Sequence, residues 1–338
     1  FNVFAIRGES YRDPQILLEG FDGILASCPE YLLCAHGPPL SGREAVVEAV
    51  TGARDAIQYL WDQTVRGINL GMTQGELIEF VQLPESFASS YLTQQNYGLV
   101  EHHVRQIHTG LMGWFDGFEA SLFPVPTADR CRRLVEGFGG RAKVAIQASA
   151  ALNDDDLRWA LELATWPVRA DGGTGEERVL LASVLRAIGQ RTTSANVRGW
   201  CLTRARELEG LAELNRYRIH RFGRGQVITA DPVVVVASLR VLLDPKRAAE
   251  VDDHLRWRID VDDAEAVCGL WIRNRVAVLT DGSKAELELA MKHEVLADLL
   301  SNRCTMTDAF ESGLVTVTGD QDRVGRVLNC FEVRSLSR

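Results

Sequence analysis

Residues 31–44 read YLLCAHGPPLSGRE, and this stretch decides how the beginning of the chain is expected to fold. Its first five residues, YLLCA, form an apolar run with the length of a buried core strand. His36 and the Gly-Pro-Pro after it predict a rigid turn, and the pairing of Ser41 with Glu44 is typical of a helix capping box. Strand, turn and helix in succession indicate an α/β layer. Because about forty residues are too few to build such a layer, we expect residues 1–42 to pack on structure outside them.

The next segment, residues 43–212, is predicted to be helical throughout. The helix after the capping box should run to about Leu70 and stop at Gly71, and TQGE at 73–76 repeats the capping-box pattern for a short helix that ends near Pro84. Further helices are predicted at 95–112, 127–138, 153–169, 175–189 and 194–209. The stretch 141–210 is typical of a helical-repeat hairpin with three short helices.

The third segment, residues 225–338, follows a basic linker at 216–225. Asp231-Pro232 predicts the start of a helix, and the alternating patterns at 254–261, 266–273 and 285–291 predict half-buried strands. Asn274-Arg275 and Asp281-Gly282 are predicted hairpin turns. Helices at 292–301 and 305–312, a strand at 314–318 and a final helix complete a strand meander with helices on one face, which is an α+β domain.

The composition narrows the class of protein. The 338 residues carry a net charge of −9, which argues against a nucleic-acid partner. Seven scattered cysteines without a CxxC pair favour reduced, mostly buried thiols and a cytoplasmic location, and no stretch is apolar enough to cross a bilayer. The chain begins at Phe1 rather than Met, so we expect an upstream segment. The compartment stays open, since a leader in that segment would make the protein secreted or periplasmic.

His36 is the first candidate site residue. It lies where the predicted strand ends, which is the place where α/β folds position ligands. A histidine there could bind a metal or transfer protons. It could equally be a loop histidine that is hydrogen-bonded to backbone, and the position alone leaves both interpretations open.

Arginines supply the other candidates. Asn2 and Arg7 lie in the opening segment, and the planar guanidinium of Arg7 suits carboxylate, phosphate or sulfate, although a surface salt bridge would explain it as well. Arg105 lies in an apolar helix, where its charge requires an anionic partner. Close to it are His102, His103 and His108, but their spacing does not match a metal-binding pair on one helix face.

Four runs of residues carry a resemblance. They are Arg7-Gly8, HGPPLSG at 36–42, RDAIQY at 54–59 and GWFDG at 113–117. Their order resembles that of alkyl sulfatases of the metallo-β-lactamase superfamily, and the resemblance covers nearly the whole chain. It implies a mixed fold in three parts. Residues 1–42 would be the C-terminal end of a metallo-β-lactamase-like αββα catalytic domain, residues 43–212 an all-α dimerisation domain, and residues 225–338 an α+β sterol-carrier-like domain.

The resemblance also implies an activity, which is zinc-dependent hydrolysis of alkyl sulfate esters, including detergents, to alcohol and inorganic sulfate. Two zinc ions would activate a hydroxide. His36 matches one metal ligand, and Asn2, Arg7 and Arg105 match residues that contact the sulfate. Asn2, Arg7 and Arg105 would together stabilise charge on the leaving group. Trp114 and Phe115 would line an apolar channel for the alkyl tail.

The family's HxHxDH segment and its two acidic zinc ligands have no counterpart in this chain. We therefore expect them in a missing N-terminal segment or separate chain, assign no catalytic acid, base or nucleophile here, and expect this polypeptide alone to be inactive. Two alternatives remain, a non-catalytic dimerising and lipid-binding module and a metallo-β-lactamase-fold hydrolase of another ester.

A homodimer is expected through the helical segment. The long helix carries Val46, Val50, Ile57 and Leu60 on one side, and these residues could pack on a second subunit or within the monomer. The sequence does not determine the length of the alkyl chain, the preference for primary or secondary sulfates, or whether the C–O or the S–O bond is cleaved.

Overall fold

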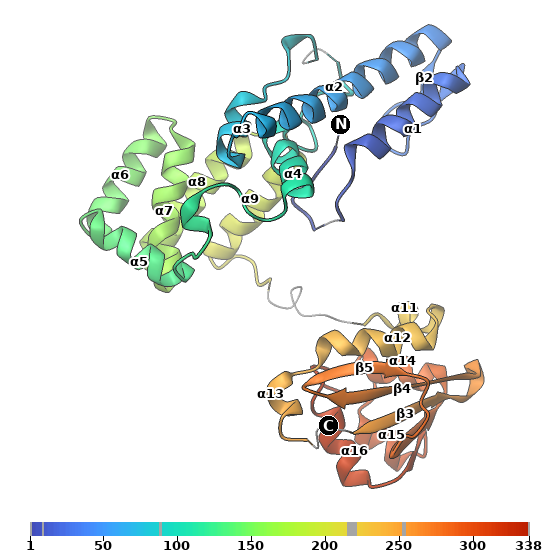
Figure 1. Ribbon diagram of the computed structural model, residues 1–338. Coiled ribbons are helices and arrows are strands. Elements are labelled where there is room, and N and C mark those ends of the chain that lie inside the picture. Colours follow the sequence, from blue (N-terminus) through green and yellow to red (C-terminus); the bar gives the residue numbers. More distant parts are fainter. Residues whose placement is uncertain (1, 9, 88–89, 215–221, 252–254, 337–338) are drawn as a thin grey trace. The chain divides into compact units, whose positions relative to one another are not determined.

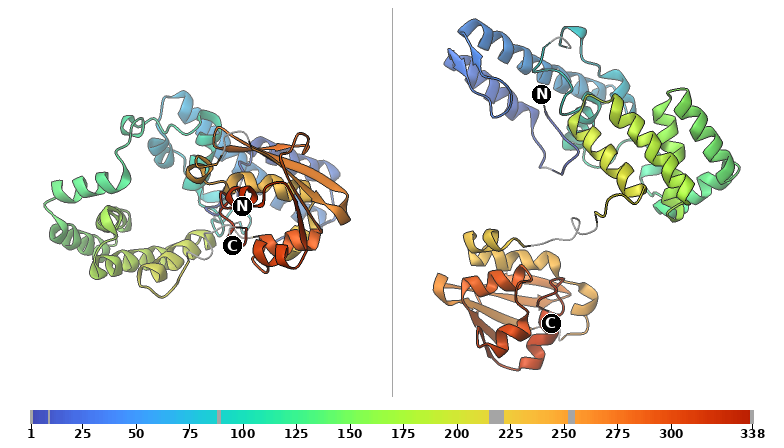
Figure 2. Two further views of the ribbon diagram at one scale, coloured as in Figure 1. Left: turned by 90° about the horizontal axis from the view of Figure 1, so that it is seen from below. Right: turned by 180° about the vertical axis from the view of Figure 1, so that it is seen from behind.

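A computed structural model describes residues 2–8, 10–87, 90–214, 222–251 and 255–336. The chain divides into two compact units, residues 1–214 and residues 215–338 (Figure 1). The first unit is mostly helical, and the second is a sheet with helices (Figure 2). Most of the basic linker predicted at 216–225 lies outside the described residues. No helix in the described ranges is long and apolar enough to cross a membrane.

The first unit begins with helix α1 (Pro14–Ser27), which packs along the long helix α2 (Arg43–Asn69). Between them lies a small antiparallel hairpin of strands β1 (Tyr31–Leu32) and β2 (Leu40–Ser41). The predicted five-residue buried strand at 31–35 is wrong, because Tyr31 and Leu33 are 68% and 78% exposed. β2 is the only strand that pairs with β1 in the described part of this unit, so no sheet covers these apolar side chains.

The start of α2 also differs from the prediction. The N-cap residue is Gly42 rather than Ser41, and no side chain caps the helix. Ser41 is instead paired with Tyr31 in the hairpin, and Gly42, at φ 95°, makes the turn from strand to helix in a conformation that glycine adopts without strain. The predicted end of the helix is confirmed, since α2 ends at Asn69 and Gly71 follows with φ 81°.

One face of α2 is buried inside its own chain. Val46, Val50, Ile57 and Leu60 are each no more than 2% exposed. Ile57 and Leu60 belong to a core that α2 shares with α3 (Gln74–Phe80) and α4 (Val100–Met112). Of the two interpretations that the sequence left open for this apolar face, packing within the monomer is therefore the correct one.

The remaining helices of the first unit stack as antiparallel neighbours. They are α5 (Thr127–Gly137), α6 (Arg141–Asn153), α7 (Leu157–Asp171), α8 (Gly175–Arg191) and α9 (Ala195–Leu208). They share a second core, which is separate from that of α2 to α4. The sequence predicted three helices over 141–210 and the structure has four, because α6 is a helix with only a weak amphipathic pattern. The capping box at Thr73 is confirmed, with Glu76 as its partner.

The second unit contains a five-stranded sheet. Its strands are β3 (Arg256–Val261), β4 (Ala266–Arg273), β5 (Val276–Thr280), β6 (Leu287–Met291) and β7 (Val315–Thr318), in the order β5-β4-β3-β6-β7. The helices are α11 (Arg224–Thr229), α12 (Pro232–Ser238), α13 (Pro245–Ala248), α14 (His293–Leu300), α15 (Met306–Glu311) and α16 (Gln321–Leu328).

The hairpin turn predicted at Asn274-Arg275 is confirmed, with both residues at positive φ. The hairpin predicted at Asp281-Gly282 is wrong, because β6 pairs with β3 in parallel rather than with β5. Residues 281–286 cross over two strands, so the sheet is not a meander. Gly282 lies against the backbone of Cys268 and the side chain of Arg258, and this close approach explains why a glycine occupies the crossing.

Alternate residues of β3 and β6 are buried in one continuous core that also includes residues of α12, α14 and α16. No cysteine is disulfide-bonded; Cys131, Cys201, Cys268 and Cys330 are buried, and Cys28 and Cys34 are exposed. Burial raises the pKa of the Cys268 thiol to about 11, so it stays protonated at neutral pH.

The separate cores predict independent effects of core mutations. Leu270 is fully buried in β4, so Leu270→Ala should lower the free energy of unfolding of the second unit by about 2–5 kcal/mol. The first unit should be unaffected. Scanning calorimetry of the full chain should show one shifted transition, while Val276→Ala on the half-exposed end of β5 should change little. A shift of both transitions by Leu270→Ala would contradict independent cores.

Candidate functional site

His36 lies at the tip of the hairpin between β1 and β2, and its side chain is exposed. Gly37 follows at φ 97°, and the ring of Tyr91 is 3.6 Å from the position that a Cβ would take there. The ring of Tyr91 therefore lies close to one side of the turn, and the His36 side chain is exposed at its tip.

The opening segment is anchored on helix α4 through a buried histidine. The backbone N–H of Phe4 donates to Nδ1 of His103 over 3.1 Å, and the His103 side chain is fully buried. Gly98 makes room for the ring, because a Cβ there would lie 2.3 Å from Cε1 of His103. Val3 and Ala5 are buried on either side of Phe4. His103 is therefore a structural residue that holds two segments together.

Arg7 is positioned by an aromatic residue of the loop before α4. Its guanidinium lies over the Tyr97 ring at 5.4 Å from the centroid and donates to the Tyr97 hydroxyl. The carbonyl of Tyr97 in turn accepts hydrogen bonds from the Ser194 hydroxyl at 2.6 Å and the Asn196 amide at 3.1 Å, at the start of α9. Stacking on the ring and the hydrogen bond to the hydroxyl together fix the orientation of the guanidinium.

Asn2 has an unusual environment. Its Oδ1 atom is buried and has no hydrogen-bond partner within the described residues. Its backbone carbonyl accepts a long hydrogen bond from Arg12 at 3.5 Å. A buried amide oxygen that lacks a donor is costly, but this atom is an acceptor and would not itself contact an anion.

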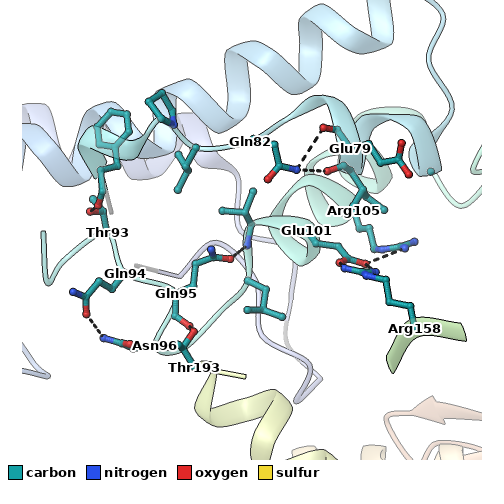
Figure 3. A pocket seen from close by; sticks show the side chains of 17 residues that line it. Glu79, Gln82, Thr93, Gln94, Gln95, Asn96, Glu101, Arg105, Arg158 and Thr193 are labelled. Carbon is teal, nitrogen blue, oxygen red and sulfur yellow. Dashed lines mark hydrogen bonds and ion pairs between the residues drawn. The ribbon is translucent and has the colours of Figure 1, made fainter. Parts of the chain in front are cut away.

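Arg105 lines a pocket of about 810 Å³ in the first unit (Figure 3). Its guanidinium donates to Gln74 at 3.2 Å and to Glu101 at 3.3 Å. Arg158 reaches the same carboxylate from α7, at 2.6 Å. The apolar part of the lining consists of Ile78, Leu83, Pro84, Phe87, Leu99 and Val100, and amide side chains surround the rest.

The charges at this end of the pocket are coupled through Glu101. Burial acts to raise the pKa of this carboxyl, but the hydrogen bond and charge of Arg158, together with Arg105, hold it below its usual range. Glu101 is therefore ionised at neutral pH. Glu79 also lines the pocket and interacts with Arg158 through its charge, so the two guanidiniums are balanced by two carboxylates and the cluster carries no formal net charge.

The structure separates the candidate residues into three places. His103 and Arg105 are two positions apart on α4, so they project about 200° from each other around the helix axis. The opening segment with Asn2 and Arg7 approaches the His103 side, and Arg105 faces the pocket. Sequence reasoning missed Arg158, because no motif connects it with Glu101 across 57 residues. The four-residue spacing of Glu101 and Arg105, in contrast, indicates from sequence alone that the two side chains can form an ion pair on one face of a helix.

The described residues do not form a zinc-pair site. No group of three or more His, Cys, Asp or Glu side chains gathers within them in a way that could hold a metal ion. A zinc ion requires three or four such ligands, and His36 alone supplies one.

Two family models match the chain. Residues 73–210 match the alkyl sulfatase dimerisation family, and residues 229–335 match the alkyl sulfatase C-terminal family. The two matches fall in the helical unit and in the sheet-containing unit, respectively.

Individual relatives extend the similarity to nearly all of the chain. A linear primary-alkylsulfatase from Pseudomonas sp. is 34% identical over 98% of the chain and 64% of its own length. An (R)-specific secondary-alkylsulfatase from Pseudomonas sp. is 26% identical over 98% of the chain and 50% of its own length. The solved structure of the stereoselective inverting sec-alkylsulfatase Pisa1 from Pseudomonas sp. superposes with a TM-score of 0.87 at 25% identity, covering 99% of this chain and 53% of that one. The chain thus spans about half to two thirds of the length of these relatives.

The buried histidine predicts a pH dependence of stability. Burial lowers the pKa of His103 from 6.5 to about 3, so the folded protein keeps it neutral while the unfolded chain binds a proton below pH 6.5. Its contribution is present above pH 6.5 and is lost as the pH falls toward 3, with a slope of at most about 1.4 kcal/mol per pH unit.

His103→Gln should flatten this slope, since an amide oxygen can accept the Phe4 N–H without titrating. Chemical unfolding from pH 7 to pH 4 measures it, with His36→Gln as the exposed-histidine control. Equal slopes for His103→Gln and the unmutated chain would show that other groups cause the pH dependence.

Proposed function

Because the chain belongs to the alkyl sulfatase family, we propose that it contributes to the hydrolysis of alkyl sulfate esters to an alcohol and inorganic sulfate. The single observation that supports this most is the 34% identity to a linear primary-alkylsulfatase over nearly the whole chain. The activity would belong to a longer polypeptide or an assembly, and this chain would supply groups that bind and orient the substrate.

Arg105 is the proposed sulfate contact with the clearest surroundings. Its guanidinium is held by Gln74 and Glu101 yet is nearly half exposed to the pocket. An alkyl sulfate has a compact anionic head and an apolar tail. The arginine end of the pocket suits the head, and the wall formed by Ile78, Phe87 and Leu99 suits the tail.

Arg7 and Asn2 are proposed as two further sulfate-binding groups, although they lie on the His103 side of α4 and so apart from the pocket that Arg105 faces. Arg7 is exposed and preoriented on Tyr97, and the side-chain amide of Asn2 can donate through its nitrogen. N–H donors at fixed positions stabilise the negative charge that develops on the leaving sulfate, because they do not have to reorient as the charge forms. The residues of this chain would thus bind, orient and stabilise charge, and no proton transfer is assigned to them.

His36 is proposed as one ligand of a zinc pair. Its exposure at the hairpin tip supports this role, because the imidazole is accessible to a metal ion. No group of three or more potential ligands gathers within the described residues, so zinc binding would require donors beyond them.

The same proposal assigns the parts of the chain. Residues 1–42 would end a metallo-β-lactamase-like catalytic domain, residues 43–212 would form a helical dimerisation domain and so a homodimer, and residues 225–338 would form a sterol-carrier-like domain. The match of residues 73–210 to a dimerisation family supports the second assignment. The mixed sheet with its helices and single core is compatible with the third.

Binding of a short alkyl sulfate tests the role of Arg105. We expect Arg105→Ala to raise the dissociation constant of hexyl sulfate at least roughly tenfold, because a charge-assisted hydrogen bond contributes about 1.5–3 kcal/mol. Isothermal titration calorimetry of the full chain, below the critical micelle concentration, measures it. Arg133→Ala is the matched control, since Arg133 is an exposed arginine on α5 with an acidic partner, Asp129. Unchanged affinity in Arg105→Ala would reject this sulfate contact.

Zinc content tests the role of His36. Equilibrium dialysis with elemental analysis should find fewer than two zinc ions per isolated chain, and His36→Gln should reduce the residual affinity. His102→Gln, on half-buried α4, is the control and should behave as the unmutated chain. Two tightly bound zinc ions per chain, or no effect of His36→Gln, would contradict the assignment.

A further inference from the structure

Gln74, the first residue of α3, contacts Arg105 through both ends of its side-chain amide. Its Oε1 accepts a hydrogen bond from the Arg105 guanidinium at 3.2 Å. Its Nε2 lies 3.4 Å from the Arg105 carbonyl, 3.3 Å from the Thr109 hydroxyl and 3.4 Å from Nδ1 of His108. A guanidinium can only donate and a carbonyl can only accept. The amide therefore has one possible orientation, with its oxygen toward the guanidinium.

The surroundings of Gln74 hold this orientation in place. Its backbone N–H donates to the Asp116 carbonyl at 2.8 Å, and the capping box at Thr73 fixes the start of α3 beside it. The Thr109 hydroxyl donates to the Arg105 carbonyl at 2.8 Å. Since a hydroxyl has one proton and two lone pairs, its oxygen remains able to accept from the amide of Gln74.

The guanidinium of Arg105 is held at both terminal nitrogens and is still accessible. Its Nη1 donates to Gln74 and its Nη2 donates to Glu101 at 3.3 Å. A guanidinium has five N–H donors, and these contacts use two of them. The side chain of Arg105 is 47% exposed, so further donors remain for an anion in the pocket.

The charges around Arg105 make the neutrality of Gln74 important. Arg105 shares Glu101 with Arg158, and Glu79, which also lines the pocket, interacts with Arg158 through its charge (Figure 3). The two guanidiniums are thus already balanced by two carboxylates. A third carboxylate, at position 74, would make the cluster negative and would repel an anion. The amide oxygen orients the guanidinium and leaves its charge unchanged.

We propose that Gln74 is a positioning residue for Arg105, and that its neutral amide gives this end of the pocket a preference for an anionic head group. The inference rests on the sulfate contact proposed above for Arg105 and adds the residue that orients it. A contact that served only to hold α3 on α4 would not require a neutral partner, since a carboxylate pairs with a guanidinium more strongly than an amide does.

The charge of the side chain at position 74 is tested with two ligands that share one tail. Gln74→Glu should weaken binding of hexyl sulfate to the full chain at least roughly tenfold, because the introduced carboxylate pairs with Arg105 and repels the sulfate. Binding of hexyltrimethylammonium, a cation, should be unchanged or tighter. Isothermal titration calorimetry measures both. Equal weakening of the two ligands would show a disturbed pocket and would overturn the proposed preference.

Gln63→Glu is the matched control. Gln63 accepts a hydrogen bond from Arg66 at 3.3 Å on α2, outside the pocket, so the same change of charge is made beside another arginine. Both ligands should bind this variant as they bind the unmutated chain. Gln74→Glu should fold, because a carboxylate in the first turn of a helix is favourable, and circular dichroism checks this.

Gln74→Met tests the positioning itself, since it removes the hydrogen bonds without adding charge, and it decides the matter if Gln74→Glu does not fold. We expect hexyl sulfate to bind it roughly fivefold more weakly, and to show no further loss when Gln74→Met is added to Arg105→Ala. Unchanged affinity in Gln74→Met, or an equal loss in the Arg105→Ala background, would reject the positioning role. Unchanged affinity in Arg105→Ala alone would instead overturn the sulfate contact, and the role of Gln74 with it.

Discussion

The hydrogen bond from the Phe4 backbone to His103 is the contact on which the arrangement of the helical unit depends. It ties the opening segment to α4, and it requires Gly98 in the preceding loop to leave space for the ring. That loop then bonds to the start of α9 through Tyr97 and Ser194. The neutral imidazole thus connects the opening segment with α4 and the loop before it, and a protonated one would place a charge in a site that excludes water.

The two sides of α4 differ in charge. The helix buries a neutral histidine on one side and presents Arg105 on another, so it can be a core element and a binding element at once. Glu101 pairs with both Arg105 and Arg158, and its lowered pKa is the result of that double pairing. Glu79 also lines the pocket and interacts with Arg158, so the two guanidiniums face two carboxylates, and the exposed part of Arg105 is what an anion could contact.

The sequence predicts elements where local patterns determine them and fails where pairing is non-local. The capping boxes at Thr73 and Thr305, the Asp231-Pro232 helix start and the Asn274-Arg275 turn depend on near neighbours, and the helices and turn predicted there are confirmed. The crossing at Asp281-Gly282 has the composition of a hairpin, but β6 gains more by pairing with β3, which no local signal reveals. Arg158 was missed for the same reason. The roles of His36, Asn2, Arg7 and Arg105 come from a resemblance, and the structure shows only where these residues lie.

The two units also differ in how completely they bury apolar surface, and this difference has a physical consequence. The sheet of the second unit forms one continuous core with helices from both ends of its segment. The helical unit has two smaller cores, one for α2 to α4 and one for α5 to α9, joined by residues 113–126. Small cores bury a smaller fraction of their surface than one large core does. The connecting segment is fixed against Thr73 and Gln74 through Asp116 and Gly117, so Trp114, Phe118 and Phe123 stay exposed. The helical unit therefore leaves apolar surface uncovered that only structure beyond these residues can bury.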